Sequence, residues 1–585
     1  MATYTVGYLI QPTGEITKDD KDLTFKQIED WERDFPKGLA STKPPAWPTE
    51  DLNSSNWSDQ FRIDDYIQAG FTGGGRGYSA RTANDVRNIF DIILSDILNS
   101  SGSDAGVAVS ADTNNNSTLV GRLKYSVSYK TIDNSGDIIA QELDDEGFVK
   151  RDALGEPIAS WRASEKILAH DKRSIFSYSN KDNSPFEFKG NFSSLPSDAQ
   201  AALKYGPDAS RVANDASFIN YLRGLDPVAD ANGKNFRLRE SKVGAMVNPP
   251  SIYMGGVRDF AYDLSGNVDG SSSYLAYADL KRTLPATLLV ATNAGMVHNL
   301  DAKTGTELAA FMPRRSMKRM LNFAKDPYSF EYTLDGPLSE HDIYDGKNWQ
   351  HIAVGTGGRG EKLIYALRSP LNSTSNNRTP DKEDYLWETG PTKGPETIGN
   401  TSETNVINDT NFSLGHITQP SRSGQTLNDE WVVVLNSGHY NDMTDGKGHG
   451  LVVLNAMTGA VIRKVLLPST ADAGRGLSGV TLVRNEDKRI VAAYAGDARG
   501  QLWRFDLRGE PATWNVSYDK PVFVTANNRP IYGAPAWQVH PEGGTIVVVA
   551  TGMLLEESDI SDTSNNESIY GIWDPTPVGE ADKSP

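Results

Sequence analysis

The chain has 585 residues, with 58 basic and 76 acidic side chains that give a formal net charge of −18. This charge repels phosphate backbones and anionic lipid, so we expect no nucleic-acid partner bound by bulk electrostatics. No stretch approaches the roughly 18 apolar residues of a membrane span, so we expect no insertion into a membrane. The absence of cysteine excludes disulfides, thiolate metal sites and cysteine nucleophiles within these residues. The 53 glycines favour a folded protein with many turns.

The first hundred residues predict the end of an α/β unit. An apolar run over 4–10 predicts a strand, and it follows Met1 so directly that it is typical of a fragment cut from a longer protein. A helix over about 84–99 is predicted from apolar residues at three- and four-residue spacing, namely Val86, Ile89, Phe90, Ile93 and Ile97. The following run of Asn, Ser, Asp, Gly and Thr indicates a polar linker over 101–117.

After this linker the apolar pattern changes from helical to alternating. Leu123, Tyr125, Val127 and Tyr129 predict a strand, which a turn at 133–136 joins to a second strand around Ile138. Helical segments are predicted within 161–168 and 216–222, and mostly β structure is predicted from Val243 onward.

A unit of apolar strand, Gly turn, second strand and polar turn recurs through the C-terminal two-thirds of the chain. Its copies lie at 288–305, 351–367, 431–459, 490–507 and, more loosely, 545–573. Each copy alone would be a hairpin with two apolar faces, and such hairpins are stable only when stacked against their neighbours. The pattern therefore favours a β-propeller over a β-sandwich, without fixing the number of blades.

Ordered sequence blocks through nearly the whole chain resemble the PilC/PilY family of type IV pilus tip adhesins and pilus biogenesis factors. The blocks are Val120–Tyr125, Phe218–Gly224, Phe236–Arg239, Val243–Gly255, Asn293–His298, Asp301–Gly305, Gly357–Gly360, Tyr494–Asp497, Leu502–Asp506 and Tyr570–Asp574. The resemblance implies a mainly β fold, with a modified, quinoprotein-like and incomplete propeller over 118–585. It also implies that 1–100 is the C-terminal part of an α/β von Willebrand A-like domain, separated from the propeller by the linker 101–117.

The resemblance further implies a function in binding rather than catalysis. Family membership predicts an exported protein at the pilus tip, outer membrane or bacterial cell surface, which promotes pilus extension over retraction, adhesion and twitching motility. Its implied partners are minor pilins, the pilus tip complex and a host receptor or surface. A glycan-binding adhesin remains an alternative.

The family's calcium loop aligns with 483–491 in this chain. Calcium takes about six to eight oxygen ligands. Asn485 and Asp487 keep two ligand positions, whereas Val483 and Val491 occupy the outer ones. Lys488 and Arg489 add positive charge, so we predict no metal and no cofactor here, and an ordinary hairpin. In it, Lys488 or Arg489 would pair with Glu486 or Asp487 in place of the ion.

Other candidate sites carry weaker patterns. Oxygen-bearing side chains gather at 263–270 and at 441–446, the second flanked by His439 and His449, but Asn/Asp/Gly runs usually form turns. Asp559–Thr563 imitates a metal site of A-like domains, yet it lies within propeller sequence. A quinone-dependent propeller dehydrogenase is the enzymatic alternative, but no nucleophile elbow, Walker loop or His-Glu-x-x-His helix occurs, and we predict no catalytic or cofactor-binding residue.

Overall fold

The computed structural model describes residues 123–581 with gaps, together with short pieces before residue 123. The gaps are 131–132, 134, 145–147, 153–156, 206–215, 226–232, 234, 248–250, 256–257, 370–378, 391–410, 440–447, 469–475, 556–558 and 560–565. Near the N-terminus, β1 (Thr5–Tyr8) pairs in parallel with β2 (Gly77–Ala80). The strand predicted over 4–10 is thus confirmed for its described part.

Only residues 86, 87, 89 and 90 of the helix predicted over 84–99 are described, and they are helical. Ile89 is buried but Phe90 is 52% exposed, so the prediction that both share a buried face is wrong for Phe90. Consecutive residues of an α-helix point about 100° apart, which turns Phe90 away from the direction of Ile89.

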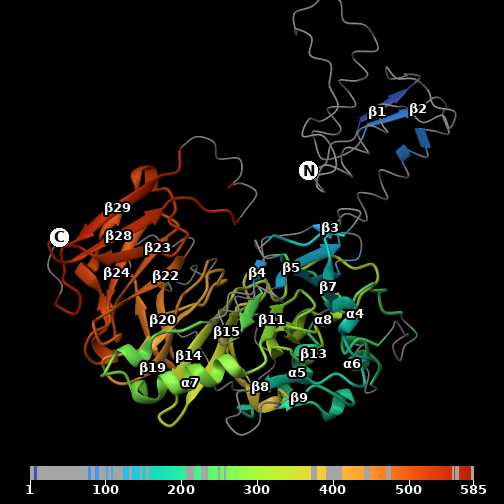
Figure 1. Ribbon diagram of the computed structural model, residues 1–585, viewed down its shortest axis with the longest axis horizontal. Coiled ribbons are helices and arrows are strands. Elements are labelled where there is room, and N and C mark those ends of the chain that lie inside the picture. The colour runs from blue at the N-terminus through green and yellow to red at the C-terminus, as the bar shows by residue number, and fades with distance from the viewer. Residues whose placement is uncertain are drawn as a thin grey trace, which may run out of the picture.

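Most of the described strands form six sheets that follow one another along the chain (Figure 1). The first contains β3 (Ser101–Gly102), β4 (Val107–Val109), β5 (Leu123–Lys130), β6 (Gly136–Glu142) and β7 (Ala159–Arg162). The second contains β10 (Ile252–Met254), β11 (Thr287–Ala291), β12 (Val297–Asp301) and β13 (Glu307–Phe311), extended by β8 (Ile175–Ser179) and β9 (Ser184–Glu187).

The third and fourth sheets each have four antiparallel strands. They are β14 (Leu338–Tyr344), β15 (Trp349–Thr356), β16 (Ile364–Arg368) and β17 (Tyr385–Thr389), then β18 (Arg422–Gln425), β19 (Trp431–Asn436), β20 (Gly450–Asn455) and β21 (Val461–Leu466). The fifth contains β22 (Leu477–Arg484), β23 (Ile490–Asp497), β24 (Gln501–Asp506), β25 (Asn515–Val516) and β26 (Phe523–Val524). The sixth contains β27 (Ala536–Val539), β28 (Thr545–Ala550) and β29 (Ile569–Asp574).

These strands confirm the predicted hairpin around 123–143 and all five repeated units. Two expectations need correction. Part of the expected linker 101–117 forms β3 and β4, because the edge of β5 offers unpaired backbone groups that these segments satisfy. The helix expected within 161–168 is limited to α4 (Ala163–Lys166), because Trp161 lies in β7.

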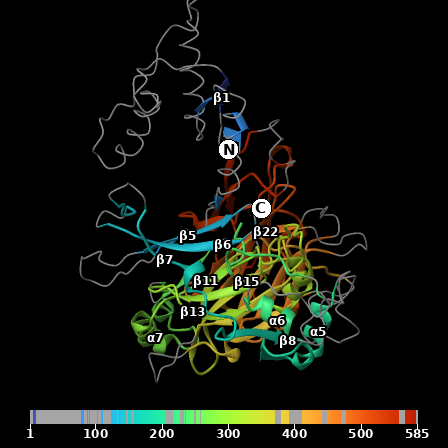
Figure 2. The same cartoon turned by 90° about the vertical axis from the view of Figure 1, so that its right-hand side faces the viewer.

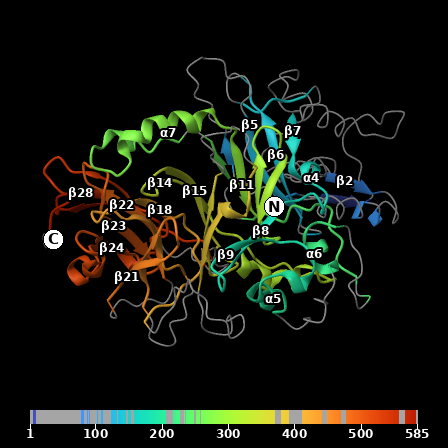
Figure 3. The ribbon, with the colours of Figure 1, turned by 90° about the horizontal axis from the view of Figure 1, so that it is seen from below.

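The remaining α-helices in the described part of the chain are short except one. They are α5 (Ser197–Leu203), α6 (Ser217–Leu222), α7 (Ser271–Thr283) and α8 (Met320–Phe323). The second, α6, confirms the helix predicted within 216–222. The 13-residue α7 lies in the region predicted to be mostly β, and Figure 3 shows it along the outside of the sheets near β14. Its Tyr274 and Ala278 belong to the core of the third and fourth sheets.

Each sheet shares a hydrophobic core with the next, because successive side chains of a strand point to opposite faces. In β11, Leu288 and Val290 pack toward the first sheet, whereas Leu289 and Ala291 pack toward the third. Figure 2 shows the first sheet, with β5, β6 and β7, lying over β11. The strand β19 repeats this division, and its four valine and leucine positions are all buried. The first strands β10, β14, β18 and β22 are neighbours in turn, as the inner strands of a propeller are.

A tryptophan from one sheet covers the polar turn of the next. The indole Nε1 of Trp387 in β17 donates to Ala456 O at 2.9 Å, and its ring lies over Gly459, which has φ +69°. Asn455 Oδ1 accepts the backbone N–H of Thr458 at 3.1 Å and thereby closes this turn. Trp161 covers the equivalent turn of β12 and β13 and donates to Ala302 O at 3.2 Å.

We expect Gly459→Ala to destabilise the protein more than Gly346→Ala does. Both glycines have positive φ, which costs an alanine about 1–2 kcal/mol. A Cβ on Gly459 would also lie 2.5 Å from the Trp387 ring, whereas a Cβ on Gly346 would meet no heavy atom within 4 Å. Overpacking adds about 1–3 kcal/mol at Gly459. Thermal melts of the two variants measure the difference, and equal melting temperatures would contradict the role of the tryptophan cover.

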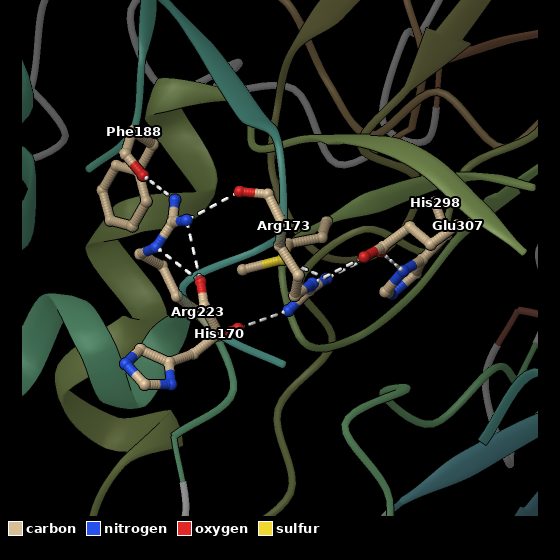
Figure 4. Close-up of polar contacts among 7 residues, drawn as sticks. His170, Arg173, Phe188, Arg223, His298 and Glu307 are labelled. Atoms are coloured by element: carbon tan, nitrogen blue, oxygen red, sulfur yellow. Dashed lines mark hydrogen bonds and ion pairs between the residues drawn. The ribbon is translucent and has the colours of Figure 1, made fainter. Parts of the chain in front are cut away.

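A buried ion-pair network joins the end of α6 and the segment just before β8 to β12 and β13 of the second sheet (Figure 4). Arg173 donates through Nε and NH2 to the two carboxylate oxygens of Glu307, at 2.6 and 2.8 Å. Glu307 Oε1 also lies 2.9 Å from His298 Nδ1. Arg223 in turn donates to the carbonyl oxygens of His170, Phe188 and Arg173. Burial would raise the pKa of Glu307, but Arg173 and His298 outweigh it and lower this pKa to about 2.

Candidate functional site

The predicted site around Asn485 and Asp487 is the tight turn between β22 and β23. The N–H of Asn485 donates to Arg489 O at 3.0 Å, and the N–H of Lys488 donates to Asn485 O at 3.0 Å. Asn485 Oδ1 accepts the N–H of Arg489, also at 3.0 Å. Lys488 has φ +62°, the left-handed conformation that often ends a three-residue hairpin loop. The prediction of an ordinary hairpin at this position is therefore confirmed.

Asp487 faces away from this turn and toward the segment 263–270. Its Oδ1 accepts Nδ2 of Asn267 at 2.7 Å, and its carbonyl oxygen accepts the hydroxyl of Ser265 at 2.6 Å. This segment follows the 3₁₀ turn Tyr262–Leu264 and leads into α7. The oxygen atoms of Asp487 therefore fix a neighbouring loop in place.

Arg489 joins the turn to two other segments. Its NH1 forms an ion pair with Asp429 Oδ1 at 2.6 Å, in the turn between β18 and β19. Its Nε donates to the carbonyl oxygen of Asn267 at 2.8 Å. We call this arrangement of Arg489, Asp429 and Asn267 the Arg489 clamp. The prediction that Lys488 or Arg489 pairs with Glu486 or Asp487 is wrong, since a better-placed carboxylate comes from the neighbouring sheet.

The residues of this turn do not fit a calcium ion. Calcium prefers six to eight oxygen ligands, several of them carboxylates. Here Asn485 Oδ1 and Asp487 Oδ1 already accept hydrogen bonds, and the guanidinium of Arg489 adds a positive charge beside them. Across the described part of the chain, no group of three or more His, Cys, Asp or Glu is arranged to hold a metal ion.

The other candidates from the sequence lie apart from this turn or serve structural contacts. In the segment 263–270, the N–H of Asp269 donates to Gln425 Oε1 at 2.9 Å. His439 and His449 are buried, and burial together with His439 lowers the pKa of His449 to about 4. Residues 441–446 lie outside the described residues. Asp559 accepts the N–H of Leu555 at 2.8 Å, and 560–563 are not among the described residues.

We expect Arg489→Gln to lower the melting temperature more than Lys488→Gln. The first substitution removes the ion pair with Asp429 and the donors to Asn267 O, a loss of about 1–2 kcal/mol because the clamp is partly exposed to solvent. The second removes the same charge from the same turn but breaks no contact of the clamp. Thermal melts in parallel measure both. A larger loss for Lys488→Gln would contradict the clamp.

Sequential antiparallel sheets, packed face to face with tryptophan-covered turns between them, define a β-propeller protein. The family model of the PilY1 beta-propeller domain matches residues 243–585. The chain belongs to this family. The helix α7 and the Arg489 clamp both lie within the matched range.

Individual relatives agree with this assignment. A type IV pilus biogenesis factor PilY1 homolog of Xylella fastidiosa (strain Temecula1) is 31% identical over 61% of this chain and 27% of its own length. The type IV pilus biogenesis factor PilY1 of Pseudomonas aeruginosa (strain PAK) is 26% identical over 92% of this chain and 46% of its own length. The chain thus spans about half or less of these relatives.

A solved structure is also similar. The crystal structure of the Pseudomonas aeruginosa PilY1 C-terminal domain aligns with a TM-score of 0.44 and 26% identity, over 56% of this chain and 65% of that one. Among the described residues, no helix is both long enough and apolar enough to cross a membrane.

Proposed function

We propose that this chain is part of a type IV pilus biogenesis factor and acts by binding proteins. The family match over 243–585 is the observation that carries this proposal. The proposed location is the bacterial cell surface, at the pilus tip or outer membrane. Deleting the gene from its source bacterium should sharply reduce the number of surface pili seen by electron microscopy, and the intact gene should restore it. Unchanged piliation in the deletion strain would refute the proposal.

A finer proposal is that the protein favours pilus extension over retraction, in contact with minor pilins. If it opposes retraction, then removing the retraction motor from the deletion strain should restore pili, although not twitching motility, which needs retraction. If pili stay absent in the double mutant, the protein is needed for assembly itself. Adhesion to a host receptor or surface is part of the same proposal. It is measured by counting the cells that attach to such a surface through the pili restored in the double mutant.

The same proposal treats the propeller as a binding module without a resident cofactor. The buried carboxylate of Glu307 supports it, since both of its oxygens are already engaged by Arg173 and His298. A stoichiometric quinone in the purified protein would instead identify a dehydrogenase. Specific binding on a glycan array would identify an adhesin that recognises carbohydrate.

We also propose the domain division inferred from the sequence. In it, 1–100 complete a von Willebrand A-like domain and 118–585 form the propeller, whose first sheet also includes β3 and β4 from the expected linker. Limited proteolysis should therefore cut first near residue 100, ahead of β3, and leave a stable fragment that begins there. Early cleavage between the sheets of the propeller would contradict this division.

A further inference from the structure

Three arginines gather where the fourth sheet meets the fifth. Arg422 lies in β18 and Arg484 ends β22, while Arg258 precedes the 3₁₀ turn at Tyr262. Arg422 Nε donates to Val480 O in β22 at 3.2 Å, and Arg484 NH2 donates back to Ser423 O in β18. The two side chains therefore bridge the same pair of strands from opposite sides.

Because Gly424 has no side chain, the side chain of Arg484 has room to lie over β18. A Cβ on Gly424 would lie 3.3 Å from Arg484 NH2. Arg422 and Gly424 are two residues apart in β18 and thus share one face of the strand, about 7 Å apart. The guanidinium groups of Arg422 and Arg484 accordingly lie on one face of β18, in the seam between β18 and β22.

None of the three arginines forms an ion pair with a carboxylate among the described residues. The nearby carboxylates have other partners. Asp342 binds Lys281 Nζ at 2.6 Å and the hydroxyls of Tyr274 and Tyr277, and Asp259 binds Arg282 at 3.0 Å. The cluster is thus a concentration of positive charge in a chain whose formal net charge is −18.

The three arginines lie close enough to disfavour one another's charge and that of the neighbouring His341. Burial lowers the pKa of Arg422, and Arg258 and Arg484 lower it further. Burial and the same three arginines lower the pKa of His341 to about 3, so its ring is neutral at neutral pH. The neutral ring of His341 therefore provides no negative charge to offset the arginines. It is held between the hydroxyls of Ser421 at 3.0 Å and Ser423 at 2.8 Å.

We propose that Arg258, Arg422 and Arg484 form a binding site for an oxyanion of the phosphate or carboxylate class. A guanidinium presents paired N–H donors that match such oxygens, and half-buried cations without a counter-ion are costly until an anion neutralises them. Arg422 and Arg484 are partly exposed and Arg258 is exposed, so an anion reaches the cluster from solvent. This inference does not depend on the proposed role in pilus biogenesis.

The test is calorimetric titration of the purified chain with inorganic phosphate and, separately, with citrate. We expect saturable binding of at least one anion, and Arg258→Gln, Arg422→Gln and Arg484→Gln should each weaken it about tenfold or more. A preference for phosphate or for citrate identifies the phosphate or the carboxylate as the recognised group. Lys150→Gln is the matched control, because Lys150 already pairs with Glu142 in the first sheet and its loss should leave binding unchanged.

Thermal melts separate this site from a purely structural role. Without anion, Arg422→Gln should melt at or above the temperature of the parent, because repulsion is relieved. The same concentration of anion should raise the melting temperature of the parent more than that of the variant. Arg258→Gln provides the test should Arg422→Gln fail to fold, because Arg258 is exposed. Absence of binding at millimolar anion, or equal affinities for the parent and the Arg258→Gln variant, would overturn the proposal.

Discussion

Trp387→Ala should destabilise the propeller by about 3–5 kcal/mol, the usual cost of removing a large buried aromatic side chain. Trp387 is fully buried between the third and fourth sheets, and its loss also leaves Ala456 O without its indole donor. The effect should appear as a large drop in melting temperature and in the denaturant concentration at the unfolding midpoint. Both sheets depend on this contact, since the ring covers the turn that joins β20 to β21.

The matched control is Trp573→Ala in the last sheet. Trp573 is 54% exposed, so the same substitution removes far less buried surface there. We expect a loss of about 1 kcal/mol, mainly from its hydrogen bond to Gly543 O. Similar melting temperatures for the two variants would show that the tryptophan cover contributes little to the stacking of the sheets.

Glu307→Gln should cost about 3–5 kcal/mol at neutral pH, because it leaves the buried guanidinium of Arg173 without its counter-charge. Glu142→Gln is the matched control. Its pair with Lys150 is about half exposed, at 42% and 46%, and we expect a loss below about 1 kcal/mol. Unfolding in denaturant measures both. Replacing Arg173 by Met together with Glu307→Gln should recover part of the loss, because no buried charge is then left unpaired.

The same carboxylate gives a pH dependence with a definite sign. Its pKa is lowered from 4.5 to about 2 in the folded protein, so the unfolded state binds the proton more readily. The stability from Glu307 is complete above about pH 4.5 and is lost as the pH falls toward 2. Stability measured between these limits should fall less steeply for Glu307→Gln than for the parent. Parallel curves would contradict the assigned pKa.

The repeated units could be predicted from sequence because each carries its signal locally. The apolar residues of β19 alternate between two buried faces, and the turn at Asn455–Gly459 has the residues that its backbone requires. The helix α7 could not be predicted in this way, because its first residues are three serines and its buried face includes the polar Lys281. Lys281 can be buried there because its ammonium group forms an ion pair with Asp342 in β14.

The candidate site could be predicted only in part. The sequence predicts that Asn485 and Asp487 are too few ligands for calcium, and it predicts an ordinary hairpin there. It does not predict the partners of Arg489, since Asn267 lies 222 residues away and Asp429 belongs to another sheet. No local pattern links a turn to a carboxylate that only the packing of two sheets brings near. The cluster of Arg422 and Arg484 could not be predicted for the same reason.

Metal analysis with thermal melts, with and without a calcium chelator, tests most directly whether Arg489 closes the 485–489 turn in place of calcium. We predict substoichiometric calcium in the purified protein and the same melting temperature in chelator, in buffer and in added calcium. Arg489→Gln should lower that temperature equally in all three solutions. A drop of several degrees in chelator, reversed by calcium, would contradict the account and show that Asn485 and Asp487 bind the ion.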